Sequence, residues 1–428
     1  MIVRKRNGTK VPFDKNKIIN AINKALIEVD GCLYENETAE EIANILEAHI
    51  EGARLIGEPL TVEDIQDRVE DLLMQSERRD VARAYIRYRY KKEVARNYKD
   101  DFIKAIGEKL SASNVQNQNA NLDEKSFGGR IGEASSYMTK DYALKYIVSD
   151  MARKNHLENM IYIHDLDNYA VGSHNCLTIP FDKLLAEGFN TRQCDIRPAN
   201  SVNTAFQLVA VIFQLQSLCQ FGGVSASHID WTMVPYVRKS FYKHYKDGLK
   251  FVEGLNDWEI TCHEFAYSDI ELVPIHDKES YSWEKAYDYA MAMTEREVYQ
   301  AVEAMYHNLN TLQSRSGNQL PFTSVNYGTC TLPEGRMVTK ALLDVSIKGL
   351  GKLHRTSIFP CGIFQVMKGV NKEPGTPNYD LYRLALRSTA QRLYPNYANV
   401  DWSGNAGYDR NDPSTYFSTM GKCKLQLM

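Results

Sequence analysis

An α/β fold is predicted for this chain of 428 residues, with a small N-terminal unit ahead of a larger one. In the larger unit, short apolar segments bounded by Gly or Pro alternate with longer helical patterns, and this alternation favours an α/β architecture. The smaller unit opens with Asn7-Gly8 between two extended runs, which is the strongest short-range signal for a β-hairpin. We expect domains at residues 1–95 and 131–428, joined by a linker at 96–130.

The N-terminal unit is predicted to be a hairpin followed by a helical bundle. Apolar residues recur at helical spacing after Asp14, which can cap the first helix. Thr61 and Asp64 have the spacing of a capping box at the start of a later helix. A last, basic helix follows and carries Tyr85.

Residues 97–130 are rich in Asn and Gln and end in Gly128-Gly129-Arg130, which is typical of a junction. Extended segments of the larger unit are expected at 175–181, 320–331 and 356–365. Residues 198–229 contain no Asp, Glu, Lys or Arg, but their longest unbroken apolar run, Leu208–Phe213, is far short of the roughly 20 residues of a membrane span. We therefore expect a buried helix there and no membrane association.

Composition excludes some classes of function. A net charge of −3 with 25% charged residues argues against a general nucleic-acid binder, which needs a basic excess. The eight cysteines form no Cys-x-x-Cys pair and no cluster with His at zinc spacing, so we expect reduced thiols, a cytoplasmic location and no metal site. The basic N-terminus lacks the apolar stretch of a signal peptide.

The first candidate site is the basic hairpin, where Lys5 and Arg6 lie near Lys17 of the next element. Such a group can bind a triphosphate, although a solvated basic hairpin has the same composition. The second is Cys176, which His174 and Asn175 precede at the entry to an apolar strand. A buried cysteine is commonly only a small hydrophobic residue, but a thiol at a strand end is well placed for a site.

A third candidate is the stretch 314–326, which alternates apolar residues with hydroxyl and amide groups, as does 355–360. Either a polar strand edge or substrate binding fits this pattern.

Residue patterns in the first 90 residues resemble the ATP-cone, the regulatory nucleotide module of ribonucleotide reductases. They are Val3-x-Lys5-Arg6-x-Gly8, Phe13-Asp14-x-x-Lys17-Ile18 and Val81-Ala82-x-x-Tyr85-Ile86. The resemblance implies that ATP or dATP binds as an allosteric effector at Lys5, Arg6, Lys17, Thr61 and Lys91.

The larger unit resembles the anaerobic, class III ribonucleoside-triphosphate reductases, which are glycyl-radical enzymes. The motifs that carry this resemblance include Tyr162-Ile163-His164-Asp165-Leu166, His174-Asn175-Cys176, Gln220-Phe221-Gly222-Gly223, Gly317-Asn318-Gln319-Leu320-Pro321-Phe322 and Ile358-Phe359-Pro360-Cys361. The family implies a ten-stranded α/β barrel around the active site, in which a glycyl radical generates a thiyl radical on a finger-loop cysteine. The products are 2'-deoxyribonucleoside triphosphates.

The same resemblance assigns roles to residues and partners. Cys176 matches the second catalytic cysteine, Asn326 the polar residue beside the thiyl cysteine, and His164 and Asn175 substrate contacts. The uncharged helix resembles a homodimer interface where deoxynucleotide effectors bind. A radical-SAM activating enzyme is implied as a partner, and the reductant can be formate or a thioredoxin-like protein.

The last residues depart from the family pattern. The finger loop of the family reads Met-Gly-Cys-Arg, whereas this chain has Met420-Gly421-Lys422-Cys423-Lys424, with Cys423 as the candidate thiyl residue. The zinc-binding cysteine pairs and the radical-bearing glycine of the family have no counterpart. We therefore expect a reductase truncated near residue 421 by an early stop, a frameshift or a split gene, and inactive alone. A non-catalytic ATP/dATP-binding regulatory fragment and a relative of the formate lyases are the alternatives.

Overall fold

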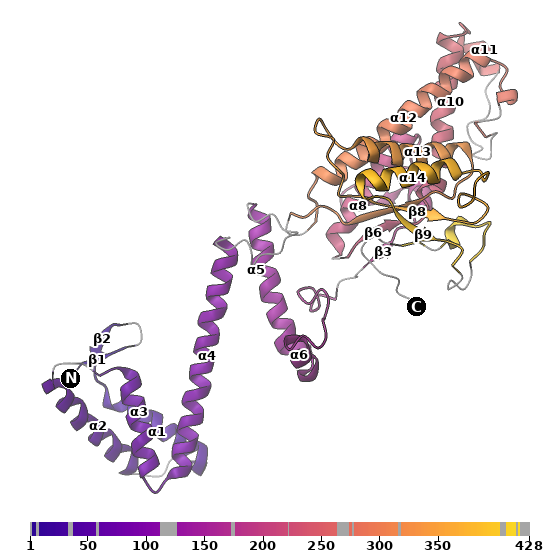
Figure 1. Ribbon diagram of the computed structural model, residues 1–428. Helices are drawn as coiled ribbons and strands as arrows, with labels where there is room; N and C mark the ends of the chain where they lie inside the picture. The colour runs from indigo at the N-terminus through magenta and orange to yellow at the C-terminus, as the bar shows by residue number, and fades with distance from the viewer. Residues whose placement is uncertain are drawn as a thin grey trace. The chain divides into compact units, whose positions relative to one another are not determined.

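The computed structural model describes residues 2–5, 8–32, 37–56, 60–111, 126–172, 176–220, 222–262, 274–275, 278–315, 318–402, 408–416 and 418–419. The chain divides into two compact units, Met1–Gly107 and Glu108–Met428. Helices and strands of both are drawn in Figure 1. The division falls inside the predicted linker and inside a helix, because α4 (Arg79–Ser111) continues past residue 95.

The first unit contains the predicted hairpin, β1 (Ile2–Arg4) paired with β2 (Lys10–Pro12) in antiparallel register. Gly8 has a φ of +80°, a left-handed value that glycine adopts readily, and Asn7 lies outside the described residues. Helices α1 (Lys15–Asp30), α2 (Glu37–Ile56) and α3 (Val62–Gln75) follow, ahead of α4. The predicted hairpin and helical bundle are thus confirmed.

Both predicted helix caps of this unit form. The Asp14 carboxylate accepts a hydrogen bond from the Asn16 N–H (3.1 Å) at the start of α1. At α3, the Thr61 hydroxyl accepts from the Asp64 N–H (3.2 Å), and the Asp64 carboxylate accepts from the Thr61 N–H (2.8 Å). A reciprocal pair of this kind satisfies two of the N–H groups left free at a helix start.

The bundle is held together by an apolar core of its own. Ile22, Leu26, Leu46 and Leu73 are almost fully buried at the contacts among α1, α2 and α3. Burying one such side chain contributes about 1.5–3 kcal/mol. This core requires no residue of the second unit.

The second unit begins with α5 (Phe127–Tyr142), the π-helical turn Ala143–Ile147 and α6 (Asp150–Leu157). A five-stranded parallel sheet then forms in the order β3 (Leu177–Thr178), β6 (Val224–Ala226), β7 (Thr323–Tyr327), β8 (Cys361–Val366) and β9 (Asn396–Asn399). The remaining elements are α7 (Phe181–Glu187), the hairpin β4 (Phe189–Asn190) and β5 (Asp195–Ile196), α8 (Val202–Cys219), α9 (Ile229–Thr232), α10 (Val234–Phe251), α11 (Asp257–Cys262), α12 (Glu284–Thr311), α13 (Pro333–Lys348), α14 (Tyr379–Arg392) and short 3₁₀ turns at Lys278–Ser280 and Pro413–Thr415. The predicted α/β class is confirmed.

Strand order in this sheet follows chain order, so each crossover moves one strand farther in the same direction. Because such crossovers are right-handed, their helices gather on one face of the sheet. Figure 1 shows α8, α13 and α14 together on one side of β6, β8 and β9. The other face is left for the side chains that build a site.

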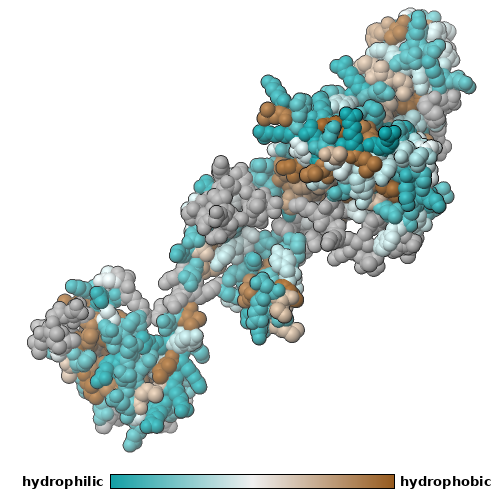
Figure 2. Space-filling view, viewed as in Figure 1, coloured by the Kyte–Doolittle hydropathy of each residue, from teal (hydrophilic) through white to brown (hydrophobic). Residues whose placement is uncertain are grey.

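The helix-covered face carries the main apolar core. Val224, Val325, Tyr327 and Phe364 point into it from the strands, and the buried residues of α8, α10, α12 and α13 surround them. Figure 2 shows the outward surface over these helices as largely hydrophilic, with hydrophobic side chains between them. This is the pattern of a sheet whose apolar core lies under its covering helices.

Helix α8 occupies residues 202–219 of the uncharged stretch 198–229 for which a buried helix was predicted. The last part of that prediction is wrong, because β6 (Val224–Ala226) lies in the same stretch. Helix α8 is long and apolar enough to cross a membrane by length and composition. Phe206 and Phe213, however, are fully buried in the core of the unit, whereas Leu215 and Leu218 are exposed. The helix therefore packs with one side into the protein.

Candidate functional site

The first unit contains a pocket of about 190 Å³ between the hairpin and the helices. Its walls are mainly apolar and include Phe13, Ile18 and Tyr85, while Lys5 and Lys17 also line it. Lys17 is largely exposed, and its ammonium lies 3.7 Å from the Asp14 carboxylate. The pocket can therefore enclose an apolar ring and hold an anionic group beside two lysines.

The residues predicted to bind nucleotide are thus brought together only in part. Lys5 and Lys17 line one pocket, and Thr61 lies next to it, with its hydroxyl engaged in the cap of α3. Lys91 lies exposed on α4 and does not line this pocket. Arg6 lies outside the described residues.

In the second unit, the sheet face opposite the helices is lined by polar side chains. Ser225 of β6 pairs with Ser324 of β7, Asn326 follows Ser324 at strand spacing, and Gln365 lies on the same face of β8. All four are buried. Because alternate residues of a strand face opposite ways, the predicted alternation of hydroxyl and amide groups with apolar residues in 320–326 creates this polar face.

Asn326 is the centre of the polar face and is fully buried. Its amide N–H₂ donates to Ser225 Oγ (3.1 Å), to the Ala226 carbonyl (2.9 Å) and to the Thr419 carbonyl (3.1 Å). Its carbonyl oxygen accepts from the Thr419 N–H (3.2 Å). Asn326 thus pairs with the backbone of Thr419 as a neighbouring strand would, and brings residues 93 positions apart into contact.

Cys176 lies directly before β3, at the opposite end of the strands from Asn326. Since Leu177 pairs with Val224 and Val224 with Thr323, Cys176 is level with Phe322, four residues before Asn326. Four residues correspond to about 13 Å along a strand. The two predicted catalytic residues therefore belong to one sheet but to different ends of it.

A buried guanidinium lies at the Cys176 end of the sheet. Arg315 stacks on Phe322, with its guanidinium carbon 3.7 Å from the ring centroid, and donates to Gln319 Oε1 (2.9 Å). Burial lowers the pKa of Arg315 to about 10, and the charges of Asp165, Asp167 and Cys176 partly oppose that shift. Arg315 is therefore a buried cation within electrostatic range of Asp165 and Asp167.

The remaining predicted site residues are His164, Asn175 and Cys423. The His164 side chain is mostly exposed, and its Nδ1 lies 2.7 Å from Asp165 Oδ2. Asn175 and Cys423 lie outside the described residues. Among the described residues, no group of three or more His, Cys, Asp and Glu side chains could hold a metal ion, so no step is assigned to zinc.

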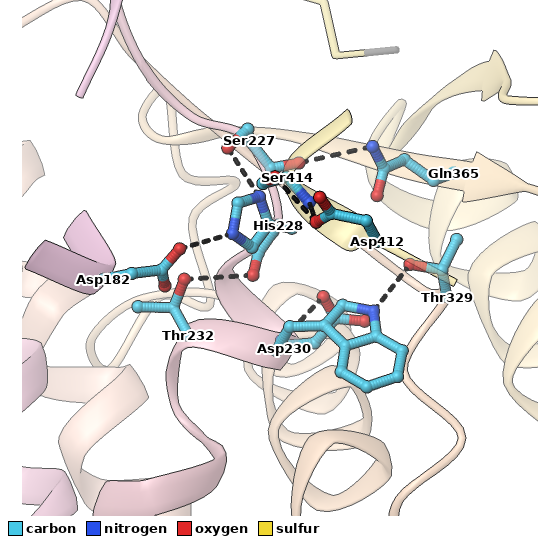
Figure 3. Close-up of polar contacts among 10 residues, drawn as sticks. Asp182, Ser227, His228, Asp230, Thr232, Thr329, Gln365, Asp412 and Ser414 are labelled. Atoms are coloured by element: carbon cyan, nitrogen blue, oxygen red, sulfur yellow. Dashed lines mark hydrogen bonds and ion pairs between the residues drawn. The ribbon is translucent and has the colours of Figure 1, made fainter. Parts of the chain in front are cut away.

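A polar cluster that the sequence reasoning missed surrounds His228, just after β6 (Figure 3). His228 Nε2 lies 2.7 Å from Asp182 Oδ2, and Nδ1 lies 2.7 Å from Ser227 Oγ. Gln365 donates from Nε2 to the Ser227 carbonyl (3.3 Å). This cluster therefore joins the end of β6 to β8 and to the first turn of α7.

The charges around His228 decide its protonation. Burial lowers the pKa of His228, but the hydrogen bond with Asp182 and the charges of Asp182, Asp230 and Asp412 outweigh this, so the pKa is raised. Burial raises the pKa of Asp230, although the Gly328 and Cys330 N–H groups donate to its carboxylate at 2.8 and 2.9 Å. The carboxyl groups around His228 therefore favour its protonated form.

One signal could have revealed this cluster in the sequence. Ser227-His228-Ile229-Asp230 follows a short apolar strand directly, and the carboxyl ends of parallel strands are where sites gather in α/β sheets.

Comparison with known proteins identifies the class to which this fold belongs. A family model described as "ATP cone domain" matches residues 1–94, and one described as "Anaerobic ribonucleoside-triphosphate reductase" matches residues 118–428. The chain therefore belongs to the anaerobic ribonucleoside-triphosphate reductase family, with an N-terminal ATP-cone.

Relatives support this membership along most of the chain. The anaerobic ribonucleoside-triphosphate reductase of Haemophilus influenzae is 31% identical over 405 residues, which cover 93% of this chain and 52% of that protein. The Escherichia coli protein of the same description is 30% identical, with 93% and 51% covered. The chain thus spans about half the length of the curated relatives it matches.

Solved structures were also compared. The anaerobic ribonucleotide reductase of Thermotoga maritima in complex with dATP and CTP superposes with a TM-score of 0.44 at 13% identity, covering 70% of this chain and 47% of that one.

Proposed function

We propose that this chain contributes to the anaerobic reduction of ribonucleoside triphosphates to 2'-deoxyribonucleoside triphosphates. The observation that carries this is the pairing of Asn326 with Thr419 on the polar sheet face. Thr419 precedes the candidate thiyl residue Cys423 by four residues in the sequence, so Asn326 bonds the backbone of a residue close to Cys423 in sequence. Membership of the reductase family supports the reaction assignment.

Cys176 is the candidate reducing thiol of the same reaction. Replacing the 2'-hydroxyl of ribose by hydrogen, with loss of water, consumes two electrons and two protons. Cys176 can supply a hydrogen atom from one strand end, and Cys423 is the candidate for abstraction of the 3' hydrogen. Formate or a thioredoxin-type dithiol is the ultimate reductant, and the buried polar face supplies the water-poor surroundings that a radical needs.

The ATP-cone is proposed to bind ATP or dATP as effector. A pocket of about 190 Å³ is smaller than the roughly 300–1,000 Å³ of a whole small-molecule site. It would enclose the base against Phe13 and Tyr85, with the phosphates at Lys5 and Lys17. A phosphate at Lys17 would compete with the Asp14 carboxylate, which lies 3.7 Å from its ammonium.

The proposed partners follow from the same assignment. Exposed Leu215 and Leu218 on α8 suit a homodimer contact beside which a deoxynucleotide effector binds. A radical-SAM enzyme would generate the radical, and the proposed location is cytoplasmic.

A second candidate function is a regulatory nucleotide-binding protein without turnover. It is favoured by one observation: the pocket and its supporting core lie wholly within the first unit. Such a chain would bind ATP or dATP independently of any catalytic partner segment.

One experiment distinguishes the two candidates. The whole chain is incubated without oxygen with CTP, dATP or ATP, formate and a radical-SAM activating enzyme, and deoxynucleotides are separated by chromatography. Reductase function predicts product that Cys176→Ser abolishes and that Cys194→Ser, at an exposed thiol of the β4–β5 turn, leaves unchanged. Absence of product together with calorimetric ATP binding favours the regulatory candidate and counts against reductase turnover by this chain on its own.

A further inference from the structure

Residues 408–416, 418 and 419 form a strap that runs along the carboxyl ends of the strands. Tyr416 is buried with Met367 after β8 and Val400 after β9, and its hydroxyl donates to the Arg410 carbonyl (2.6 Å). From this anchored base the strap reaches Asn326 of β7 through Thr419. The strap is therefore held at two places, the cluster around Tyr416 and the side chain of Asn326, and Asn326 also belongs to the candidate site.

A third place is His228, which faces Asp412, a residue that precedes both Tyr416 and Thr419 along the strap. In Figure 3 the imidazole lies between Asp182, from α7, and Asp412, from the strap. Asp412 is exposed, and its carboxylate accepts from the Ser414 N–H (2.9 Å) and hydroxyl (2.7 Å). The charge of His228 helps to lower the pKa of Asp412, after the hydrogen bonds of Ser414.

We propose that His228 is a positioning residue whose positive charge, facing Asp412, holds the strap across the polar face of the sheet beside the candidate active site. The proposal rests on the proposed function only in naming that face an active site. His228 is anchored independently of the strap by Asp182 and Ser227. His228 can therefore hold the strap when protonated and release it when neutral, without rearranging the sheet.

The hold of His228 on the strap depends on pH. Every carboxylate that faces His228 favours its protonated form: Asp182 on α7, Asp230 on α9 and Asp412 on the strap. Because the pKa of His228 is raised, its contribution is present below its unfolded value near 6.5 and is lost as pH rises through the folded value. Because the pKa of Asp412 is lowered, its contribution is lost only in acid, as pH falls through that lowered value.

The strap itself contains a matched control. Asp409 accepts from the Asn411 N–H (2.9 Å), just as Asp412 accepts from the Ser414 N–H (2.9 Å). Both carboxylates are exposed turn-formers on the same segment, but only Asp412 contributes to the raised pKa of His228. Asp412→Asn and Asp409→Asn therefore remove one charge each and keep the turn.

Hydrogen exchange of the whole chain tests the proposal. Protection of peptides spanning 408–419 is measured from pH 6 to pH 9 and corrected for the intrinsic exchange rate at each pH. In the native protein, protection should fall about two- to fivefold as His228 loses its proton, the range for a weak charge interaction at an exposed carboxylate. Asp412→Asn should be equally low at every pH, and Asp409→Asn should follow the native curve.

In His228→Gln, protection of 408–419 should no longer change with pH, since the variant removes the charge that faces Asp412. A native pH profile in Asp412→Asn would overturn the proposal, as would a protection of 408–419 that does not change with pH in the native chain. Exchange requires no turnover, so failure here leaves the reductase assignment standing. An inactive chain likewise leaves this test decisive.

Discussion

The nucleotide pocket of the first unit and the polar face of the second differ in how they hold their polar groups. In the pocket, the walls are apolar and the lysines lie at the rim, where Lys17 is largely exposed. On the polar face, Asn326 is fully buried and bonded on both its oxygen and its nitrogen. The pocket can lose a lysine without unfolding, whereas the face cannot lose Asn326 at low cost.

The same difference appears in the distance along the chain. The pocket's hairpin and α1 come from the first 30 residues, and only α3 and Tyr85 are added from farther away. The polar face joins Asn326 to Ser225 and Thr419, which are 101 and 93 positions away. Local patterns therefore determine the first site, and the chain topology determines the second.

The largest expected effect is the loss of stability when Asn326 is removed from the buried polar face. Asn326→Ala leaves the Ala226 and Thr419 carbonyls and the Thr419 N–H without their partner, so the second unit should lose about 3 kcal/mol of unfolding free energy. Ser225→Ala removes only one of these bonds and should cost about 1 kcal/mol. Urea unfolding of the whole chain measures both changes.

The first unit provides the control for this prediction. Its core is separate, so ATP affinity measured by calorimetry should be unchanged in Asn326→Ala. A variant that weakened ATP binding as strongly as it destabilised the second unit would contradict the independence of the two sites.

The next largest effect concerns ATP binding by the two lysines of the nucleotide pocket. Lys5→Ala and Lys17→Ala should each weaken ATP binding about tenfold, because a hydrogen bond to a charged group contributes about 1.5–3 kcal/mol and solvent reduces it at the rim. Unfolding free energies should stay within about 0.5 kcal/mol of the native value. Calorimetric titration with ATP measures the affinity.

Two other lysines sharpen this test. Lys10, on β2 of the same hairpin, and Lys91, on α4, do not line the pocket, so alanine at either should change ATP affinity by less than about twofold. A tenfold loss in Lys91→Ala would instead support the role that the family resemblance implies for this residue, and would place the phosphates outside the pocket described.

How much of each site can be predicted from the sequence depends on how far apart its residues lie along the chain. The β1–β2 hairpin and the Thr61/Asp64 cap were predictable because each depends on residues within a few positions of one another. Ser324 and Asn326 were predictable as a polar strand edge, but the partner at Thr419 was not, since no local pattern encodes a contact 93 positions away. His228 was missed for the same reason, because Asp182 is 46 positions away and Asp412 farther still.

The smallest expected effect concerns the cap of α3, next to the nucleotide pocket. Thr61→Ala removes the hydroxyl that accepts the Asp64 N–H and should destabilise the first unit by about 1 kcal/mol. The hydrogen bonds of the Thr61 hydroxyl and N–H lower the pKa of Asp64. That contribution is therefore present above pH 3.8 and is lost as pH falls through the lowered value.

Urea unfolding of the first unit at neutral pH and in acid measures this cap. Thr61→Ser keeps a hydroxyl and should retain most of the stability, whereas Asp64→Asn should remove the acid dependence that this carboxylate contributes. ATP affinity separates a cap from a ligand contact, because Thr61→Ser and Thr61→Ala bind ATP alike if Thr61 only caps α3. If the hydroxyl also contacts the nucleotide, as the family resemblance implies, alanine alone should weaken binding beyond the loss explained by unfolding.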